Sequence, residues 1–397
     1  MIESGPPGVA LGVVHLVERL TVGGAETLAV RLANARAATG KPTGLYTLQP
    51  GGGLAGRIAP AVEVRSLDLA RGSVRRPWSF LAGAVGGRRA LTRRLAAGGV
   101  SVLQTHLPEA NFWGLMLTWR RPCSVVATVH SNDEFHYGDD DSAARRNLRR
   151  RAYRLVIDRC DAVVAVSDSV RDSLIRELAL SPRLADRIAV VPNGVEIPEP
   201  LDHAARRALR QSLDIPPDEP VLLGAGRLTA LKNFDHLVAI AARLREAGIA
   251  VTTLIAGEGE EHDGLAAAID QHGLAGRVRL LGVRDDLDRL QQIADVFVLP
   301  SRWEGLPLVL LEAMAAATPV VSYSIDGVVE VIEDGRAGLL APPGDEEALA
   351  RAVSDLLADP ERRARLGTAG RALVADQYGL QRSVAALEEI YTAVATR

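Results

Sequence analysis

Cysteine, aromatic residues and long apolar runs are scarce in this chain of 397 residues. Its only two cysteines, Cys123 and Cys160, are too few for a disulfide framework and lack the spacing of a metal site. The chain has no run of about 18 apolar residues, and its N-terminus lacks the basic start and the cleavage site of an export signal. We therefore expect a cytoplasmic protein without membrane spans.

Lysine is also rare. The chain has only two lysines, Lys41 and Lys232, compared with 44 arginines. The formal net charge of −3 is unevenly distributed along the chain. The residues up to Val195 carry a net charge of +9, and the residues after it carry −12. Aromatic residues make up only 4% of the chain, which together with the negative total argues against a nucleic-acid partner. The division of charge predicts that the two halves bind different partners.

The order of short and long hydrophobic segments predicts the fold. Short β-branched runs alternate with longer segments of helical period, once before residue 195 and again after a stretch rich in proline and charge at 196–220. The expected strands are VALGVVHL, SVLQTH, SVVATVH, AVVAVS and IAVVPNG, then VLLGAG, VTTLIAG, RVRLLG, DVFVLP, PVVSYS and GLLAPP. We predict an α/β protein with two doubly wound parallel-sheet domains at 1–195 and 196–375, and a C-terminal helix at 376–397 that crosses back to the first domain.

The loops that follow the strands of the second series are the expected binding site. In doubly wound sheets, ligands bind beyond the carboxyl ends of the strands, where the next helix directs its unpaired amides. In GAGRLTALKNFDHL, Arg227 and Lys232 flank one such loop. A lysine kept in a chain of arginines indicates a compact charge for a phosphate, although an ordinary solvated loop is the alternative for this segment alone.

Two other loops carry weaker signals. LIAGEGEE has two glycines after a buried strand but lacks the full dinucleotide spacing. In LLGVRDDLDRL, Val283 and Arg284 are expected at a strand end, where main-chain groups can pair with a base. Residues 286–288 and 139–141 fit the loose D-x-D pattern of metal-dependent sugar transfer, but the pattern is frequent by chance, and we predict no metal site.

The segment SRWEGLPLVLLEAMAAATPVV places two carboxylates in an otherwise apolar run. Pro307 favours the first position of a helix, so Glu304 is expected in the turn before it and Glu312 inside it, roughly 8 Å farther along the axis. Buried carboxylates are costly without partners, and the hydroxyls of a sugar nucleotide are suitable partners. A loop acid and a second acid at the helix rim are the alternative for this motif alone.

Together these motifs resemble the retaining glycosyltransferases of family four, which have the two-domain GT-B fold. The resemblance covers nearly the whole chain and consists of VGGAETLAVRLA, TVHSND, AVVAVSDSV, VVPNGVEIP, GRLTALKNFDHLVAIAARL, SRWEGLPLVLLEAMAAATPVV and DQYGLQRSVAALEEIY, in this order. It implies two Rossmann-like domains facing across a deep cleft, with the acceptor on the first and the nucleotide-sugar donor on the second. The anomeric configuration would be retained.

The resemblance also assigns the donor to individual residues of the second domain. These are Arg227 and Lys232 for the diphosphate, Glu304 with the amides of Gly305 and Leu306 for the transferred sugar, and Glu312 for the ribose. Two cations and the amides of a helix stabilise the leaving diphosphate, so no divalent metal or tightly bound cofactor is expected.

In the first domain, the resemblance implies that Gly23 and Gly24 approach the diphosphate and that His130 of TVHSND lies beside the donor sugar. His106 of QTHL is a weaker candidate, either structural or facing the acceptor. The sequence departs from the family in IDGVVEVIEDG, where Asp326 replaces a glycine and Val329 replaces a proline. This departure affects the expected wall beside the sugar and the identity of the donor.

Two arginine-rich faces in the first half suggest a partner. Their residues are Arg145, Arg146, Arg149 and Arg150 in one segment and Arg88, Arg89, Arg93 and Arg94 in another. Such faces suit anionic lipid or a lipid-diphosphate acceptor, and peripheral attachment at the inner face of the membrane is then expected. A solvated helix surface is the equal alternative.

Three classes of function fit the sequence. The first is transfer of a hexosyl residue from a nucleotide sugar, with a UDP-sugar favoured and GDP-mannose as the alternative donor. The acceptor would be a glycan, a lipid-linked glycan or a small molecule, in bacterial polysaccharide or glycoconjugate biosynthesis. The others are a sugar-nucleotide epimerase on the same scaffold and a catalytically silent sugar-nucleotide binder.

Overall fold

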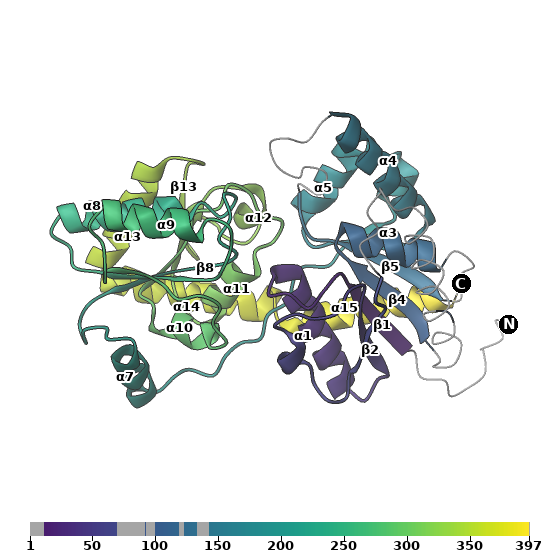
Figure 1. Cartoon of the computed structure of the whole chain (residues 1–397), viewed down its shortest axis with the longest axis horizontal. Coiled ribbons are helices and arrows are strands. Elements are labelled where there is room, and N and C mark those ends of the chain that lie inside the picture. Colours follow the sequence, from purple (N-terminus) through teal and green to yellow (C-terminus); the bar gives the residue numbers. More distant parts are fainter. Residues whose placement is uncertain (1–11, 70–91, 93–99, 119–122, 133–142, 397) are drawn as a thin grey trace. The chain divides into compact units, whose positions relative to one another are not determined.

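The computed structural model describes residues 12–69, 92, 100–118, 123–132 and 143–396 (Figure 1). Its contacts divide the chain into two units. The N-terminal unit consists of residues 1–193 together with 380–397, and the C-terminal unit consists of residues 194–379. Each unit is built around one parallel sheet.

The described strands of the N-terminal unit form a seven-stranded parallel sheet in the order β3-β2-β1-β4-β5-β6-β7. They are β1 Gly12–Val17, β2 Thr43–Thr47, β3 Glu63–Ser66, β4 Val100–His106, β5 Ser124–Val129, β6 Ala162–Ala165 and β7 Ile188–Val190. The described helices of this unit are α1 Gly24–Ala38, the 3-10 turn η1 Ala55–Arg57, α3 Pro108–Leu117, α4 Ala143–Arg159, α5 Asp168–Glu177, α6 Pro182–Ala185 and α15 Leu380–Ala395.

The sequence pattern did not predict β2 and β3. The segment EVRS of β3 is exposed along its whole length and carries two charged residues, so it lacks the apolar alternation of a half-buried strand. It belongs to the sheet because it lies in parallel register beside β2. As an edge strand it needs only one partner, and its charges suit an edge that faces water.

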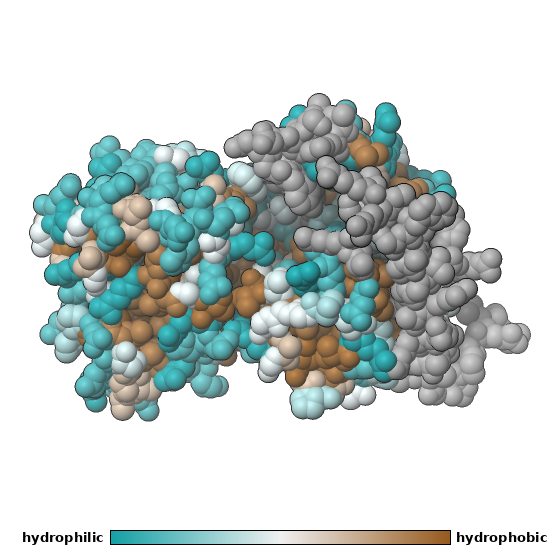
Figure 2. Space-filling view, in the orientation of Figure 1, coloured by the Kyte–Doolittle hydropathy of each residue, from teal (hydrophilic) through white to brown (hydrophobic). Residues whose placement is uncertain are grey.

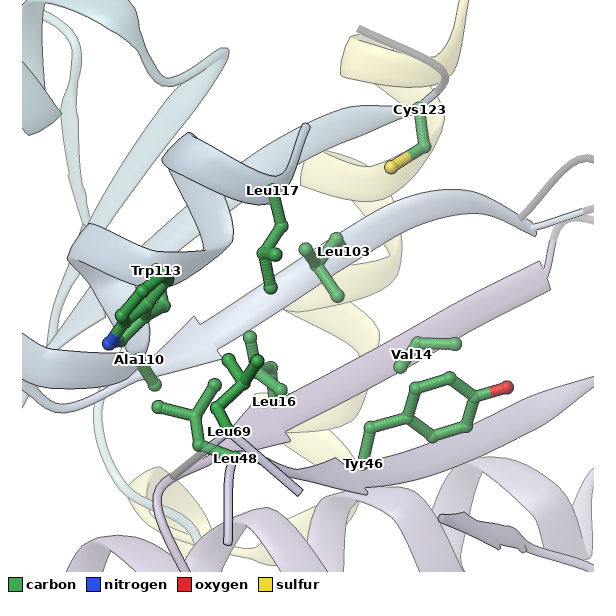
Figure 3. Close-up of a cluster of buried hydrophobic side chains, with 10 residues drawn as sticks. All are labelled: Val14, Leu16, Tyr46, Leu48, Leu69, Leu103, Ala110, Trp113, Leu117 and Cys123. Atoms are coloured by element: carbon green, nitrogen blue, oxygen red, sulfur yellow. The ribbon is translucent and has the colours of Figure 1, made fainter. Parts of the chain in front are cut away.

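The two faces of this sheet differ in chemistry. Figure 3 shows Val14, Leu16 and Leu103 pointing into an apolar cluster with Trp113 and Leu117 of α3. Because successive side chains of a strand point to opposite faces, the residues that alternate with them lie under α1 and α15.

Buried polar groups occur on this second face. Gln104 lies there, between Leu103 and Thr105 of β4, and its Nε2 donates to Thr128 Oγ1 at 2.9 Å. Tyr391 of α15 donates its hydroxyl to Gln104 Oε1. Arg36 of α1 donates from Nε to Glu388 Oε1 of α15 at 2.5 Å. These bonds attach α15 to the N-terminal unit.

The described strands of the C-terminal unit form a six-stranded parallel sheet in the order β10-β9-β8-β11-β12-β13. They are β8 Val221–Ala225, β9 Thr252–Ala256, β10 Val278–Leu280, β11 Val296–Leu299, β12 Val320–Tyr323 and β13 Leu339–Ala341. The helices are α7 His203–Ser212, α8 Phe234–Glu246, α9 His262–Gln271, α10 Leu287–Ile293, α11 Leu308–Ala315, α12 Asp326–Val329, α13 Glu346–Ala358 and α14 Pro360–Gln377.

The strand order of this second sheet confirms the predicted doubly wound topology. The chain runs outward from β8 through β9 to β10, then returns to the other side of β8 and runs outward again through β11 and β12 to β13. The direction therefore reverses between β8 and β11, which is where doubly wound sheets bind ligands. Figure 2 shows mainly hydrophilic side chains on the visible surface over α8 and α9, as expected of an outer helical layer.

Among the described residues, no helix combines the length and the apolar character that a membrane crossing requires.

Candidate functional site

Two loops meet at the reversal point of the C-terminal sheet, and each carries one of the predicted residues. Lys232 follows β8, Glu304 follows β11, and Lys232 Nζ donates to Glu304 Oε1 at 2.5 Å. Their side chains are 17% and 11% exposed. Main-chain Arg302 N also donates to Leu231 O at 2.9 Å, so the two loops are joined by the backbone as well as by the ion pair.

Asn233 strengthens this junction. It precedes α8 with a left-handed backbone, at φ 56° and ψ 38°, and its side chain makes no capping hydrogen bond to the helix. Instead its Oδ1 accepts from Arg302 Nε at 3.1 Å. The left-handed conformation is one that asparagine tolerates better than most residues, so the sequence LKNF allows the sharp turn that directs Lys232 towards Glu304.

The loop that carries Arg227 lies directly on the loop after β9. A side chain at Gly257 would place its Cβ 1.8 Å from Gly226 O, and one at Gly259 would place it 2.1 Å from Leu228 O. Leu228 N donates to Glu258 O at 2.9 Å across the same contact. The two glycines of LIAGEGEE therefore allow close packing beneath Arg227, which is itself exposed.

The turn before α11 has the predicted arrangement. Glu304 lies in the turn and Glu312 lies inside the helix, while Pro307 is the N-cap residue, one position before the first helical residue. Gly305 and Leu306 are buried between them. The amides of the first helical turn therefore lie close in sequence to Glu304, as anion binding at a helix N-terminus requires.

The segment that departs from the family pattern lies against this turn. A Cβ at Gly327 of α12 would be 2.3 Å from Gly305 O and 2.6 Å from Glu304 O, so only glycine fits there. Asp326 and Val329, the two unusual residues, are both exposed. The contact with the Glu304 turn is made by Gly327, which the departure leaves unchanged.

Val283 and Arg284 lie in the loop beyond β10, which ends at Leu280, rather than at the strand end. The Arg284 guanidinium donates to both carboxylate oxygens of Asp286, from Nε and Nη2, each at 2.8 Å. Partial burial acts to raise the pKa of Asp286, but the hydrogen bonds and charge of Arg284 hold it below its usual value. The side chain of Arg284 is thus fixed, and Asp286 is engaged by a cation.

Potential metal ligands do not gather in the described parts of the chain. No group of three or more histidine, cysteine, aspartate or glutamate side chains there has the arrangement of a metal site. The second D-x-D segment, residues 139–141, lies outside the described residues.

The N-terminal unit brings three histidines together. His106 Nδ1 lies 3.1 Å from His130 Nε2, and His106 Nε2 lies 3.2 Å from His15 Nδ1. Burial lowers the pKa of His130 to about 4 and that of His106 well below its usual value. Burial, and then the nearby charge of Arg36, lowers the pKa of His15 to about 3.

His15 was not a candidate in the sequence, since only the register of β1 beside β4 brings it to His106. The predicted Gly23 is the N-cap residue of α1 and Gly24 is its first helical residue, so both lie at the start of that helix. His130 and the two glycines belong to the N-terminal unit, whereas the other predicted residues belong to the C-terminal unit.

A separate pocket of about 370 Å³ lies within the C-terminal unit. Its lining does not include any predicted site residue, although it shares the two loops that carry Lys232 and Glu304. The lining residues are Asn233, His236, Ser301, Arg302, Tyr323, Ile325, Pro343 and Gly344.

The arginine-rich face of α4 is less free than the sequence suggested. Arg146, Arg149 and Arg150 are half-buried, and Arg150 forms an ion pair with Glu177 of α5. The side chain of Arg145 and the second arginine-rich segment, residues 88–94 apart from residue 92, lie outside what the structure describes.

Comparison with known proteins gives matches along most of the chain. Residues 22–198 match the family model described as Glycosyltransferase Family 4, and residues 205–373 match the model described as Glycosyl transferases group 1. A D-inositol 3-phosphate glycosyltransferase of Xylanimonas cellulosilytica is 32% identical over 316 residues, which cover 76% of this chain and 73% of that protein.

Other relatives match over a shorter length. An alpha-D-kanosaminyltransferase of Streptomyces kanamyceticus is 32% identical over 60% of this chain, and the chain spans only 62% of that enzyme. Among solved structures, HepE of Anabaena in complex with UDP-glucose has a TM-score of 0.80 at 20% identity, covering 96% of this chain and 100% of that one. This last likeness concerns the fold alone.

Proposed function

Because the chain belongs to the family-four glycosyltransferases and has the GT-B fold, we propose that it transfers a hexosyl residue from a nucleotide-diphosphate sugar to an acceptor. The anomeric configuration is retained, and no divalent metal takes part. A UDP-sugar is the favoured donor, because a solved structure of similar fold holds UDP-glucose, and GDP-mannose is the alternative.

The observation that carries this proposal is the contact between Lys232 and Glu304. A cation and a carboxylate from separate loops meet at the reversal point of a doubly wound sheet, beside the start of α11. This edge of the sheet is where such folds bind phosphorylated ligands. The cation suits a diphosphate, and the carboxylate suits the hydroxyls of a sugar.

The chemical step places new negative charge on the diphosphate. When the bond between the sugar C1 and the phosphate oxygen breaks, its electron pair stays with that oxygen. Arg227, Lys232 and the first amides of α11 belong to the loops at this edge of the sheet, and in this proposal they stabilise this charge more in the transition state than in the ground state. A metal would duplicate a role that these groups already fill.

The remaining candidates bind parts of the donor that do not react. Glu312 accepts the ribose hydroxyls, and main-chain groups of Val283 and Arg284 pair with the base. Gly305 and Leu306 contribute amides to the transferred sugar. In the N-terminal unit, Gly23 and Gly24 approach the diphosphate, and His130 lies beside the sugar.

The acceptor belongs to the N-terminal unit in this proposal. It is a glycan, a lipid-linked glycan or a small molecule, and one relative is named for a small molecule, D-inositol 3-phosphate. The arginines of α4 offer positive charge to an anionic membrane surface that would present a lipid-linked acceptor. Arg150 shares its charge with Glu177, so this attachment would be peripheral and reversible.

Release of free nucleoside diphosphate tests the proposal. A transferase releases it in proportion to added acceptor, whereas an epimerase gives at most transient release and a silent binder gives none. The donor is identified first, by thermal unfolding with sugar derivatives of uridine, guanosine and adenosine diphosphate. A ligand at 100 times its dissociation constant stabilises the folded chain by about 2.7 kcal/mol. The proposal fails if no sugar nucleotide both stabilises the chain and yields nucleoside diphosphate with any acceptor.

A further inference from the structure

The pocket of the C-terminal unit contains a buried polar group that the protein leaves without a partner. Its volume of about 370 Å³ lies within the range of small-molecule sites. Ser301, two residues after β11, lines the pocket and is 0% exposed. Its Oγ is buried and makes no hydrogen bond in the described parts of the chain. A buried hydroxyl without a partner is costly, and a ligand in the pocket would supply that partner.

The side of the pocket formed by Ser301, Arg302 and Asn233 is rich in hydrogen-bond donors. Arg302 donates from Nε to Asn233 Oδ1 at 3.1 Å, and its two terminal nitrogens make no hydrogen bond to the described residues. Asn233 is the N-cap residue of α8, a helix of 13 residues, and its side chain makes no capping bond to that helix. A guanidinium group beside a helix N-terminus favours an anionic group, and a phosphate suits both.

The side of the pocket that adjoins β12 and β13 differs in charge. Tyr323 ends β12, and its hydroxyl forms a hydrogen bond with His236 Nδ1 at 2.6 Å. Asp235 precedes His236 in the sequence, and Asp345 follows a lining residue of the loop after β13. Burial raises the pKa of the Tyr323 hydroxyl, and the negative charges of Glu346, Asp345 and Asp235 raise it further. Neutral hydroxyl groups are therefore better suited to this side than a second anion.

We propose that this pocket is a second binding site, separate from that of the donor, and that it takes a small phosphate ester with hydroxyl groups, such as a hexose phosphate. The phosphate oxygens accept from Arg302, Asn233 and Ser301. The hydroxyl groups of the ligand lie towards Tyr323 and His236. The lining includes none of the residues assigned to the donor, so this site does not rest on the function proposed above.

Calorimetric titration of the full-length protein tests the class of ligand. The probes are the 6-phosphates of glucose and mannose, inorganic phosphate and free glucose. We expect at least one hexose phosphate to bind about tenfold more tightly than inorganic phosphate, because its hydroxyls add hydrogen bonds, and free glucose to bind more weakly than both. The proposal is wrong if neither hexose phosphate binds, or if free glucose binds as tightly as they do.

A matched pair of serine variants tests the buried hydroxyl. Ser322 of β12 is also 0% exposed, but its Oγ donates to Leu299 O at 2.8 Å and it does not line the pocket. Without ligand, Ser301→Ala should keep or raise the thermal midpoint, since it removes an unpaired hydroxyl, whereas Ser322→Ala should lower the midpoint. We expect the affinity for the hexose phosphate to fall about 10- to 100-fold in Ser301→Ala alone. Unchanged affinity in Ser301→Ala overturns the proposal.

A second pair of variants tests the charge that binds the phosphate. Arg302→Gln removes the guanidinium but keeps an N–H group that can donate to Asn233. Arg336→Gln is the control, because Arg336 is an exposed arginine of the same unit that pairs with Glu333. We expect binding of inorganic phosphate to be lost in Arg302→Gln and kept in Arg336→Gln. Equal affinities in the two variants show that Arg302 does not hold the phosphate.

The donor site is the other place where a phosphate compound can bind. We expect the affinity for the hexose phosphate to be unchanged in Arg227→Gln and in the presence of saturating UDP. If either abolishes binding, the compound occupies the donor site and the second site is wrong. If no sugar nucleotide binds but binding of the hexose phosphate depends on Ser301, the proposed function fails and the second site stands.

Discussion

Lys232 Nζ and Glu304 Oε1 lie 2.5 Å apart, although 72 positions separate the two residues in the sequence. One belongs to the loop after β8 and the other to the turn before α11. In the proposed reaction they serve different parts of the donor, the diphosphate and the sugar. Binding of the diphosphate would thus draw the ammonium group from the carboxylate and release that carboxylate for sugar hydroxyls.

Substitution of either partner tests this site. We expect Lys232→Ala and Glu304→Gln each to lower kcat by roughly 10²–10³, by analogy with loss of one preorganised group at a developing charge. The thermal midpoint should also fall in both variants, because each removes one partner of a largely buried ion pair and leaves the other charge without it. Lys41→Ala is the matched control. Lys41 is exposed and pairs with Glu388, and both of these residues belong to the N-terminal unit, away from the Lys232–Glu304 pair. Wild-type kcat in the first two variants would remove both residues from the active site.

Glu312→Ala should weaken donor binding without slowing the chemical step. A contact with the ribose is the same in the ground and transition states, so its loss raises KM and leaves kcat unchanged. We expect the dissociation constant for the donor to rise about 10- to 100-fold, as for a hydrogen bond to a charged group. Calorimetric titration measures it, and Glu347→Ala, at an exposed glutamate paired with Arg351, is the control. A fall in kcat alone would contradict the ribose assignment.

Gly327→Ala should damage activity by moving the Glu304 turn. The new Cβ would lie 2.3 Å from Gly305 O, so the backbone of one segment must shift. Gly264→Ala is the matched control, because its Cβ in α9 meets only the end of the Glu261 side chain at 3.6 Å. We expect kcat to fall at least about tenfold in the first variant, since small displacements of reacting groups are costly. If both variants keep full turnover, the packing of Gly327 against the turn does not matter for catalysis.

Removal of divalent metal should leave turnover intact. In the proposed reaction, Arg227, Lys232 and the amides of α11 provide the positive charge that a metal would otherwise supply to the diphosphate. The assay compares nucleoside diphosphate release before and after treatment with EDTA, followed by addition of magnesium. Loss of activity with EDTA and recovery with magnesium would show that the assignment of these cations is wrong.

If an anionic membrane presents the acceptor, attachment of the protein to that membrane should depend on the arginines of α4 and on the salt concentration. Each basic residue near an anionic surface contributes about 1 kcal/mol, and the Debye length falls from ~10 Å at 0.1 M to ~3 Å at 1 M salt. We expect co-sedimentation with anionic but not neutral liposomes, lost at high salt and in the variant with Arg145, Arg146, Arg149 and Arg150 changed to glutamine. Equal sedimentation of wild type and variant would identify this face as solvated surface.

Local sequence patterns predicted the two parallel sheets and the positions of the loops between strands and helices. Apolar alternation and turn residues are local properties, so they could be recognised without the structure. The same reasoning missed β3, whose charged segment joins the sheet only through its pairing with β2. It also treated the glycines of LIAGEGEE as a weak phosphate signal, whereas they allow one loop to pack on another.

The site could also be predicted only in part, because contacts between segments that are distant in the sequence leave no local pattern. The positions of Lys232 and Glu304 followed from the strand ends that precede them, but their direct contact depends on packing between distant loops. His15 carries no signal in the sequence, since the register that places it beside His106 is fixed by the whole sheet. Contacts that cross strands therefore remained hidden, and these include the contact between His15 and His106.

The return of α15 to the N-terminal unit has a consequence for the order in which the protein can assemble during synthesis. Tyr391 and Glu388 reach Gln104 and Arg36 only after the entire C-terminal unit has been made. The N-terminal unit leaves the ribosome first but cannot be completed until the other unit has emerged. The surface that α15 later covers includes the polar side chains of Gln104 and Arg36, which water can solvate meanwhile, so the nascent chain exposes less apolar surface there than a purely hydrophobic surface would.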